Sequence, residues 1–190
     1  MNHDFPIVCV GGSAGALEAY TRLLENLPND LGAAIVIVNH ITMLPTQLHN
    51  ILPRFTLMPV ELISENLVIV PNRVFIIPAN RDLSVSKVGF HLSPISKPRG
   101  WPDVITVFLK SLAANWDGRI VAVIVSGLDG DGAEALRGIK EVGGITIAQL
   151  PSTAKRPDMP QSAIDSGDVD YVLSPEDIAK QIRKIAFDER

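Results

Sequence analysis

The chain has 190 residues, of which 46% are apolar and 20% charged, and it carries a formal net charge of −4. A chain of this length fits one domain and buries roughly 70% of the surface that its unfolded form exposes, so its core requires neither a metal nor a disulfide. Nucleic acids and anionic membranes attract strongly basic faces, and the mild negative charge therefore predicts neither as a partner.

The N-terminus and the single cysteine bear on localisation. Residues 1–6 lack the charged-then-apolar pattern of a signal peptide, and no apolar run approaches the roughly 18 residues of a membrane span. Cys9 lies in the apolar run 7–10, where a cysteine usually acts as a small hydrophobic residue. One cysteine cannot form an internal disulfide, which favours a reducing compartment. We expect a cytoplasmic protein without membrane insertion.

The first part of the chain alternates short β-branched runs with stretches whose apolar residues recur every three or four positions. The first pattern predicts buried strands and the second predicts amphipathic helices. The predicted elements are a strand over 6–10, a helix over 14–27, a strand over 33–38, a short helix over 46–52 and a strand over 60–64.

The rest of the chain continues this alternation. Residues 74–77 and 83–85 flank a turn-forming segment and predict a hairpin, and the segment 94–102, rich in Pro, Gly and Ser, predicts a surface loop. The later predicted elements are a helix over 104–115, a strand over 120–125, a helix over 133–142, strands over 145–148 and 169–173, and a helix over 175–187. Together they predict an α/β fold: a three-layer, doubly wound, mostly parallel sheet with an antiparallel edge hairpin.

Three predicted strands each end in a residue suited to catalysis. Ser13 follows the first strand, His40 follows the second, and Asp129 and Asp131 follow the strand near residue 120. In an open parallel sheet, ligands bind at the carboxyl ends of the strands. A histidine activates a serine hydroxyl by taking its proton, and an aspartate orients the imidazole. The set predicts nucleophilic catalysis, and the spacing leaves the choice of aspartate open.

The turn at Ser13 also suits a developing negative charge. The first amides of the predicted helix have no backbone acceptor, and the helix dipole favours an anion there. A carbonyl attacked by Ser13 would develop its oxyanion beside these donors. Gly12 and Gly15 leave room for that carbonyl to approach.

Each of these residues alone has a commoner structural interpretation. Ser13 suits a helix N-cap, His40 a hydrogen-bonded loop residue, and the aspartates a turn. Segment 11–15 matches the G-x-S-x-G elbow, but the order Ser, His, Asp differs from the Ser, Asp, His order of the α/β-hydrolases. The segment fits neither a dinucleotide-binding motif nor a P-loop, because Ser13 replaces the second glycine and no Gly-Lys-Ser/Thr follows.

Five sequence blocks resemble the chemotaxis protein-glutamate methylesterases, the CheB catalytic domains, over residues 6–182. The blocks are VGGSAG at 10–15, VIVNH at 36–40, VFIIP at 74–78, SGLDGDG at 126–132 and IAQ at 147–149. Each block alone is a weak signal, but together, in order and at matching spacing, they are specific. The resemblance implies that residues 1–190 form a single methylesterase catalytic domain, without the family's phosphoreceiver domain or a methyltransferase domain.

The resemblance assigns the nucleophile to Ser13, the base to His40 and the aspartate to Asp131 rather than Asp129. Members of the family hydrolyse glutamyl methyl esters, and often deamidate glutamine, on the cytoplasmic domains of methyl-accepting chemoreceptors. The resemblance therefore implies acylation of Ser13, release of methanol and hydrolysis by a water that His40 activates, with no cofactor and no metal.

The resemblance also implies that the backbone amides of Ala14 and Leu128 form an oxyanion hole and that Gly12 and Met159 lie beside the substrate. Ala14 stands where many members have threonine, which removes a hydroxyl but keeps the amide. Two other hypotheses remain open from the sequence. One is a non-catalytic module that docks on receptors or on another partner, and the other is a hydrolase of other small acyl esters.

Overall fold

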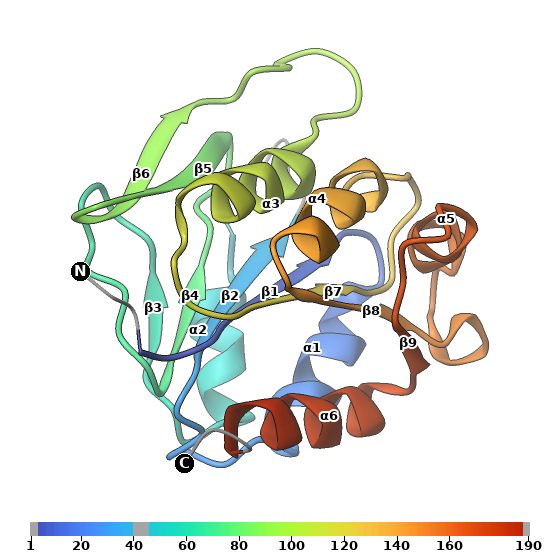
Figure 1. The fold of residues 1–190 in the computed structure, drawn as a ribbon, viewed down its shortest axis with the longest axis horizontal. Coiled ribbons are helices and arrows are strands. Elements are labelled where there is room, and N and C mark those ends of the chain that lie inside the picture. Colours follow the sequence, from blue (N-terminus) through green and yellow to red (C-terminus); the bar gives the residue numbers. More distant parts are fainter. Residues whose placement is uncertain (1–3, 40–45, 188–190) are drawn as a thin grey trace.

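A seven-stranded sheet forms the centre of the computed structural model, which describes residues 4–39 and 46–187 (Figure 1). Its order is β3-β4-β2-β1-β7-β8-β9, and every neighbouring pair is parallel. The strands are β1 (Ile7–Gly12), β2 (Ala34–Asn39), β3 (Val60–Leu62), β4 (Arg73–Ile76), β7 (Ile120–Ile124), β8 (Ile145–Gln149) and β9 (Tyr171–Leu173). A separate antiparallel pair consists of β5 (Arg81–Ser86) and β6 (Gly89–Pro94).

Helices cover both faces of the sheet, which gives three layers (Figure 1). One face carries α1 (Ala16–Glu25), α2 (Leu48–Ile51) and α6 (Pro175–Phe187). The other face carries α3 (Val104–Asn115), α4 (Leu136–Glu141) and α5 (Asp158–Asp165). Three short 3-10 turns complete the description: η1 (Leu52–Arg54), η2 (Ala133–Ala135) and η3 (Pro151–Thr153).

Two apolar clusters, one on each side of the sheet, hold these layers together. Successive side chains of a strand point to opposite faces. In β1, Ile7 and Cys9 therefore pack into the cluster beneath α3, whereas Val8 and Val10 pack into the cluster beneath α1. All four side chains are buried, and each large apolar side chain so buried contributes about 1.5–3 kcal/mol. The predicted three-layer α/β fold is confirmed.

The antiparallel hairpin exists, but different segments form it. The predicted partner 74–77 overlaps β4, which pairs in parallel with β2 and β3 instead. The observed hairpin pairs β5 with β6 across a turn that ends at Gly89, whose φ is +144°. The prediction missed β6 because its only strong turn signal is that single glycine.

Helix α5 was also missing from the prediction. Pro157 occupies its N-cap position and Pro160 lies in its first turn. Proline is tolerated there because the amides of the first turn have no intrahelical acceptor. In a sequence, however, two prolines so close together indicate a loop.

The order of the strands creates a switch point at β1. The chain passes from β1 to its neighbour β2 on one side, and β7 later pairs with the other edge of β1. Gly12 lies opposite Asn39 and Gly11 lies opposite Ile124, so the carboxyl ends of these three strands are adjacent. Ligands of open α/β sheets bind at such a point. No helix within the described residues has the length and apolar character to cross a membrane.

Candidate active site

Ser13 lies in the turn between β1 and α1. Its amide donates to the carbonyl of Ser126 at 2.9 Å, and its own carbonyl accepts from the amide of Ala16 at 3.1 Å. Gly15, with φ of +74°, occupies the N-cap position of α1, and none of the described side chains caps that helix. The hydroxyl of Ser13 is therefore not used as an N-cap, which was the simplest structural interpretation of this residue.

The amide of Leu128 faces the Ser13 hydroxyl. The Leu128 nitrogen donates to Ser13 Oγ at 3.4 Å, and the Leu128 side chain is 46% exposed. The neighbouring glycine makes this approach possible, because a Cβ on Gly127 would lie 2.7 Å from Ser13 Oγ and 2.6 Å from Met159 Cε. Real Cβ atoms essentially never show contacts under 3.0 Å, so a side chain at position 127 would force the end of the Met159 side chain or the Ser13 hydroxyl to move. The turn thus brings a backbone donor next to the Ser13 hydroxyl.

Three other predicted site residues surround this pair. Ala14 is exposed, and its carbonyl accepts from Ser126 Oγ at 2.9 Å. The space beside Gly12 is filled, since a Cβ there would lie 2.6 Å from Tyr20 Oη. Met159 is fully buried, and its amide donates to the carbonyl of Gly127 at 3.0 Å. Gly12 and Met159 therefore shape the site mainly from beneath.

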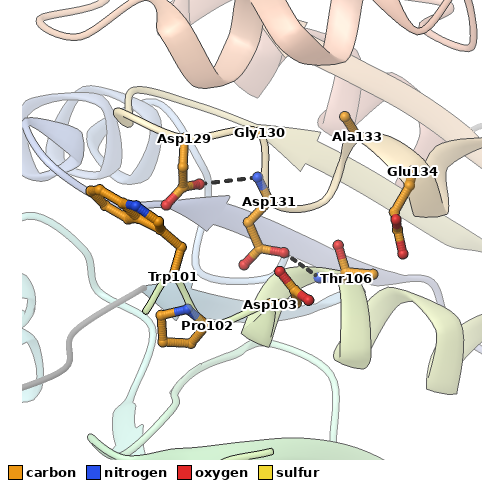
Figure 2. Close-up of a pocket in the computed structure, with 9 residues that line it drawn as sticks. All are labelled: Trp101, Pro102, Asp103, Thr106, Asp129, Gly130, Asp131, Ala133 and Glu134. Carbon is orange, nitrogen blue, oxygen red and sulfur yellow. Dashed lines mark hydrogen bonds between the residues drawn. The ribbon is translucent and has the colours of Figure 1, made fainter. Parts of the chain in front are cut away.

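The carboxylate of Asp131 lies at the N-terminus of α3 (Figure 2). Its Oδ2 accepts from the amide of Ile105 and its Oδ1 from the amide of Thr106, each at 2.9 Å. The side chain is only 7% exposed. Two amide donors at a helix N-terminus satisfy a buried carboxylate, so Asp131 is firmly oriented. The side chain of Asp129 instead accepts the Asp131 amide at 3.0 Å, as an aspartate in a turn does.

A cavity of about 360 Å³ adjoins Asp131 (Figure 2). Its lining includes the exposed ring of Trp101 and several acidic side chains, namely Asp103, Asp129 and Glu134. Burial raises the pKa of Asp131 above its usual value, and the two amide bonds oppose that shift. The negative charge of Asp129 raises the pKa further. The surroundings of Asp131 would therefore favour a neighbouring positive charge.

His40, the third residue of the predicted triad, lies outside the described residues. The residue before it, Asn39, ends β2 opposite Gly12. Its side-chain oxygen accepts from Tyr20 Oη at 2.8 Å, which ties the end of β2 to α1. The structure thus brings Ser13 and the turn containing Asp131 to one edge of the sheet.

Ser126 and Gln149 belong to the sequence blocks at 126–132 and 147–149, but no sequence pattern predicts that either residue lies at the site. Both are almost fully buried, and Ser126 NH donates to Gln149 Oε1 at 3.0 Å. One feature of the sequence could have indicated their role. Each is a polar residue at the end of an apolar strand, and a buried polar side chain requires a hydrogen-bond partner. Within the described residues, no three side chains of the metal-binding types gather into a metal site.

Comparison with known proteins identifies the family. A sequence profile described as CheB methylesterase matches residues 8–182, which is most of the chain. The chain belongs to the CheB methylesterase family. It is accordingly a hydrolase, in agreement with the enzyme class expected from the sequence.

Individual relatives in this family cover the chain almost completely. A protein of Leptospira interrogans, provisionally named protein-glutamate methylesterase/protein-glutamine glutaminase, is 32% identical over 179 residues, which is 93% of each chain. Protein-glutamate methylesterase/protein-glutamine glutaminase 2 of Burkholderia lata is 33% identical over 180 residues. The match covers 93% of this chain and 52% of the Burkholderia protein, so the chain spans about half the length of that relative.

The fold agrees with a solved member of the family. The crystal structure of the Thermotoga maritima CheB methylesterase catalytic domain superposes with a TM-score of 0.87 and 28% sequence identity. The superposition covers 96% of this chain and all of that one. The parallel sheet and the helical layers are therefore those of a CheB catalytic domain.

Proposed function

We propose that this protein hydrolyses glutamyl methyl esters on other proteins, with Ser13 as nucleophile, His40 as general base and Asp131 as the residue that orients the base. The observation that carries the proposal is the 3.4 Å approach of the Leu128 amide to Ser13 Oγ at the switch point of the sheet. A serine hydroxyl not used as a cap, beside a backbone donor, fits an acyl-transfer site. The names of the Leptospira and Burkholderia relatives support the ester substrate.

In the proposed first half-reaction, Ser13 Oγ attacks the ester carbonyl while His40 takes the hydroxyl proton. The carbonyl oxygen becomes an oxyanion and accepts from the amides of Leu128 and Ala14. Collapse of this intermediate breaks the bond to the methoxy group, which leaves as methanol with the proton from His40. A glutamyl ester of Ser13 is the product of this step.

In the second half-reaction, water replaces the serine. His40 takes a proton from the water, and the resulting hydroxide attacks the acyl carbon. The second oxyanion collapses, Ser13 Oγ leaves with the proton from His40, and the glutamyl carboxylate is released. Deamidation of glutamine follows the same sequence with ammonia as the first leaving group, so a single site accounts for both activities in the relatives' names.

Asp131 supports the base in this scheme without changing its own charge. Its two oxygens already accept the amides of Ile105 and Thr106, and each carboxylate oxygen has a further lone pair. The carboxylate can therefore accept from an imidazole while the helix holds it in place. The acidic lining of the adjoining cavity favours the imidazolium that forms during turnover.

The proposed substrate is the cytoplasmic domain of a methyl-accepting chemoreceptor, which places the protein in the cytoplasm. We further propose that residues 1–190 act as one catalytic domain and that the reaction requires no cofactor. Exposed apolar side chains lie on the turn beside the nucleophile and on the rim of the cavity next to Asp131, namely Leu128 and Trp101. Such side chains suit contact with another protein.

Labelling by a fluorophosphonate tests the proposed chemistry. The reagent should modify Ser13 and leave the other serines unmodified, because the proposal assigns an activating base and an oxyanion hole to the Ser13 hydroxyl. Mass spectrometry of the digested protein would locate the adduct. A folded protein that stays unlabelled would support a docking module instead. Labelling, together with turnover of small esters but not of methylated receptor, would support a hydrolase of small acyl esters.

A further inference from the structure

The side chain of Gln149 joins three backbone segments beneath the candidate site. It is 1% exposed and lies at the carboxyl end of β8. Its Oε1 accepts from the amide of Ser126 at 3.0 Å, and its Nε2 donates to the carbonyl of Thr153 at 3.0 Å and to Thr153 Oγ1 at 3.2 Å. The amide orientation is determined by chemistry, because an N–H donor faces one end of the side chain and a carbonyl faces the other.

Ser126, the partner of Gln149, uses all its polar groups in contacts around the nucleophile. Its carbonyl accepts from the Ser13 amide at 2.9 Å, and its hydroxyl donates to the carbonyl of Ala14 at 2.9 Å. The same hydroxyl accepts from the amide of Arg156 at 2.9 Å. Ser126 is fully buried, so these bonds have no competition from solvent.

The segment 127–128 depends on this arrangement. The amide of Gly127 donates to the carbonyl of Arg156 at 3.0 Å, and the Leu128 amide that follows lies 3.4 Å from Ser13 Oγ. The position of the Leu128 donor relative to the nucleophile is therefore set by the contacts of the two residues before it. Gln149 holds the backbone of Ser126, and Ser126 contacts Ser13 and precedes the segment 127–128. Gln149 therefore helps to position both Ser13 Oγ and the Leu128 amide, which lie 3.4 Å apart.

We propose that Gln149 is a positioning residue for the oxyanion site, which it holds in place through the backbone of Ser126. The proposal rests on the function proposed above, because it assumes that the Leu128 amide stabilises an oxyanion on a group attached to Ser13. Transition-state donors act well only when they are held in place before reaction, and small displacements weaken them. Gln149 touches no reacting atom in this account, so its effect falls on turnover and not on binding of the substrate.

A purely structural role would have a different signature. Loss of buried hydrogen bonds destabilises a fold wherever they occur. The same strand offers a matched control in Thr146, which is also fully buried. Thr146 Oγ1 donates to the carbonyl of Asp168 at 2.6 Å, in contacts apart from Ser13 and Leu128. Gln149→Met and Thr146→Val each remove buried hydrogen bonds from β8, but only the first disconnects Ser126.

The experiment compares these two variants with the wild type in two assays, at a temperature where all are folded by circular dichroism. The first assay measures kcat and KM for methanol release from methylated receptor. The second measures the rate at which a fluorophosphonate modifies Ser13, which needs the oxyanion site but no receptor. For Gln149→Met we expect kcat and the labelling rate to fall together by about 10- to 100-fold, with KM unchanged. Thr146→Val should retain both rates within about twofold.

Several results would overturn the proposal. They are equal rates for Gln149→Met and wild type, a loss confined to KM, or an equal loss in Thr146→Val. If Gln149→Met does not fold, Gln149→Asn takes its place with the same expected losses, since its shorter side chain stays polar but cannot reach both the Ser126 amide and the Thr153 carbonyl. Wild type that is labelled but inactive on receptor would refute the proposed substrate while the labelling rates still decide the role of Gln149. Wild type that is never labelled would refute both.

Discussion

The amide nitrogen of Leu128 lies 3.4 Å from the hydroxyl oxygen of Ser13, although 115 residues separate the two in the chain. Adjacent parallel strands explain this proximity, because β1 ends just before Ser13 and β7 ends just before the turn that contains Leu128. Neither residue has a special chemical character alone. In the proposed mechanism, the sheet places a donor where an attacked carbonyl would accumulate negative charge.

Replacement of Gly127 by alanine tests the tightness of this turn. The new Cβ would lie 2.7 Å from Ser13 Oγ and 2.6 Å from Met159 Cε, so the Ser13 hydroxyl, the Met159 side chain or the turn must move, and each of these changes disturbs the approach of the Leu128 amide to Ser13 Oγ. We expect kcat to fall by at least about tenfold and stability to fall by about 1–3 kcal/mol. Gly138→Ala is the control, because nothing lies within 4 Å of its added Cβ and alanine favours the helix. Full activity in Gly127→Ala would show that the donor geometry is unimportant.

The choice between the two aspartates is open to a direct comparison. Asp131→Asn places an amide N–H against an amide donor of α3 and weakens the orientation of the base, so kcat should fall by about 10⁴-fold. Asp129→Asn keeps an oxygen for the Asp131 amide and should retain most activity. Measurement of kcat for both variants would show which aspartate the reaction requires. A larger loss in the Asp129 variant would exclude Asp131 as the residue that orients the base.

The sequence alone came close to this site because its motif residues follow apolar strands. Runs of β-branched residues before Ser13 and before the turn 126–132 made the strand ends recognisable, and the carboxyl ends of parallel strands converge. The spacing did not choose between Asp129 and Asp131, since both follow the same strand. The structure separates them physically: Asp131 is held by the N-terminus of α3, whereas Asp129 accepts a turn amide.

The ion pair between α1 and α6 predicts a pH-dependent stability. Arg22 Nε donates to Glu176 Oε1 at 2.7 Å, and Arg22 Nη2 donates to Oε2 at 3.0 Å. This hydrogen bonding lowers the pKa of Glu176 below its usual value. The pair therefore stabilises the fold above the pKa of an unfolded glutamate, and the contribution disappears as the pH falls through the lower pKa of the folded state.

Urea unfolding of wild type and Glu176→Gln would measure this contribution. Both side chains are about one-third exposed, so we expect a difference of less than about 1 kcal/mol at pH 7. The difference should shrink toward zero as the pH falls through the lowered pKa of the folded-state Glu176 carboxylate. A difference that grows on acidification would contradict the assigned pKa direction.

Cys9 offers a probe of global unfolding. The thiol is fully buried in β1, and burial raises its pKa well above the usual value, with a smaller contribution from the charge of Asp131. Because the thiolate is the reactive form, the native protein should react very slowly with a thiol-specific disulfide reagent at pH 8. Addition of denaturant should release one equivalent of thiol. Stoichiometric reaction within seconds, without denaturant, would show that β1 is accessible in the native state.

Other parts of the fold escaped prediction for identifiable reasons. The hairpin of β5 and β6 depends on pairing between segments whose register no local pattern encodes, and β4 resembles a hairpin strand although it lies inside the parallel sheet. Helix α5 begins among prolines that indicate a loop in the sequence. Gln149 was recognisable as part of a block, but its role depends on a bond to Ser126, which is 23 residues away. Hydrogen bonds between residues so far apart in the chain produce no periodic pattern in the sequence.

Methanol release from methylated chemoreceptor, compared between wild type and Ser13→Ala, tests the role of Ser13 as nucleophile most directly. Ser13 is only partly buried and has no capping role, so this substitution should leave the fold intact. We expect wild type to release methanol stoichiometrically with the glutamyl esters lost, and Ser13→Ala to be slower by roughly 10⁴-fold or more. Equal release by a correctly folded Ser13→Ala variant would contradict the assignment of Ser13 as the nucleophile.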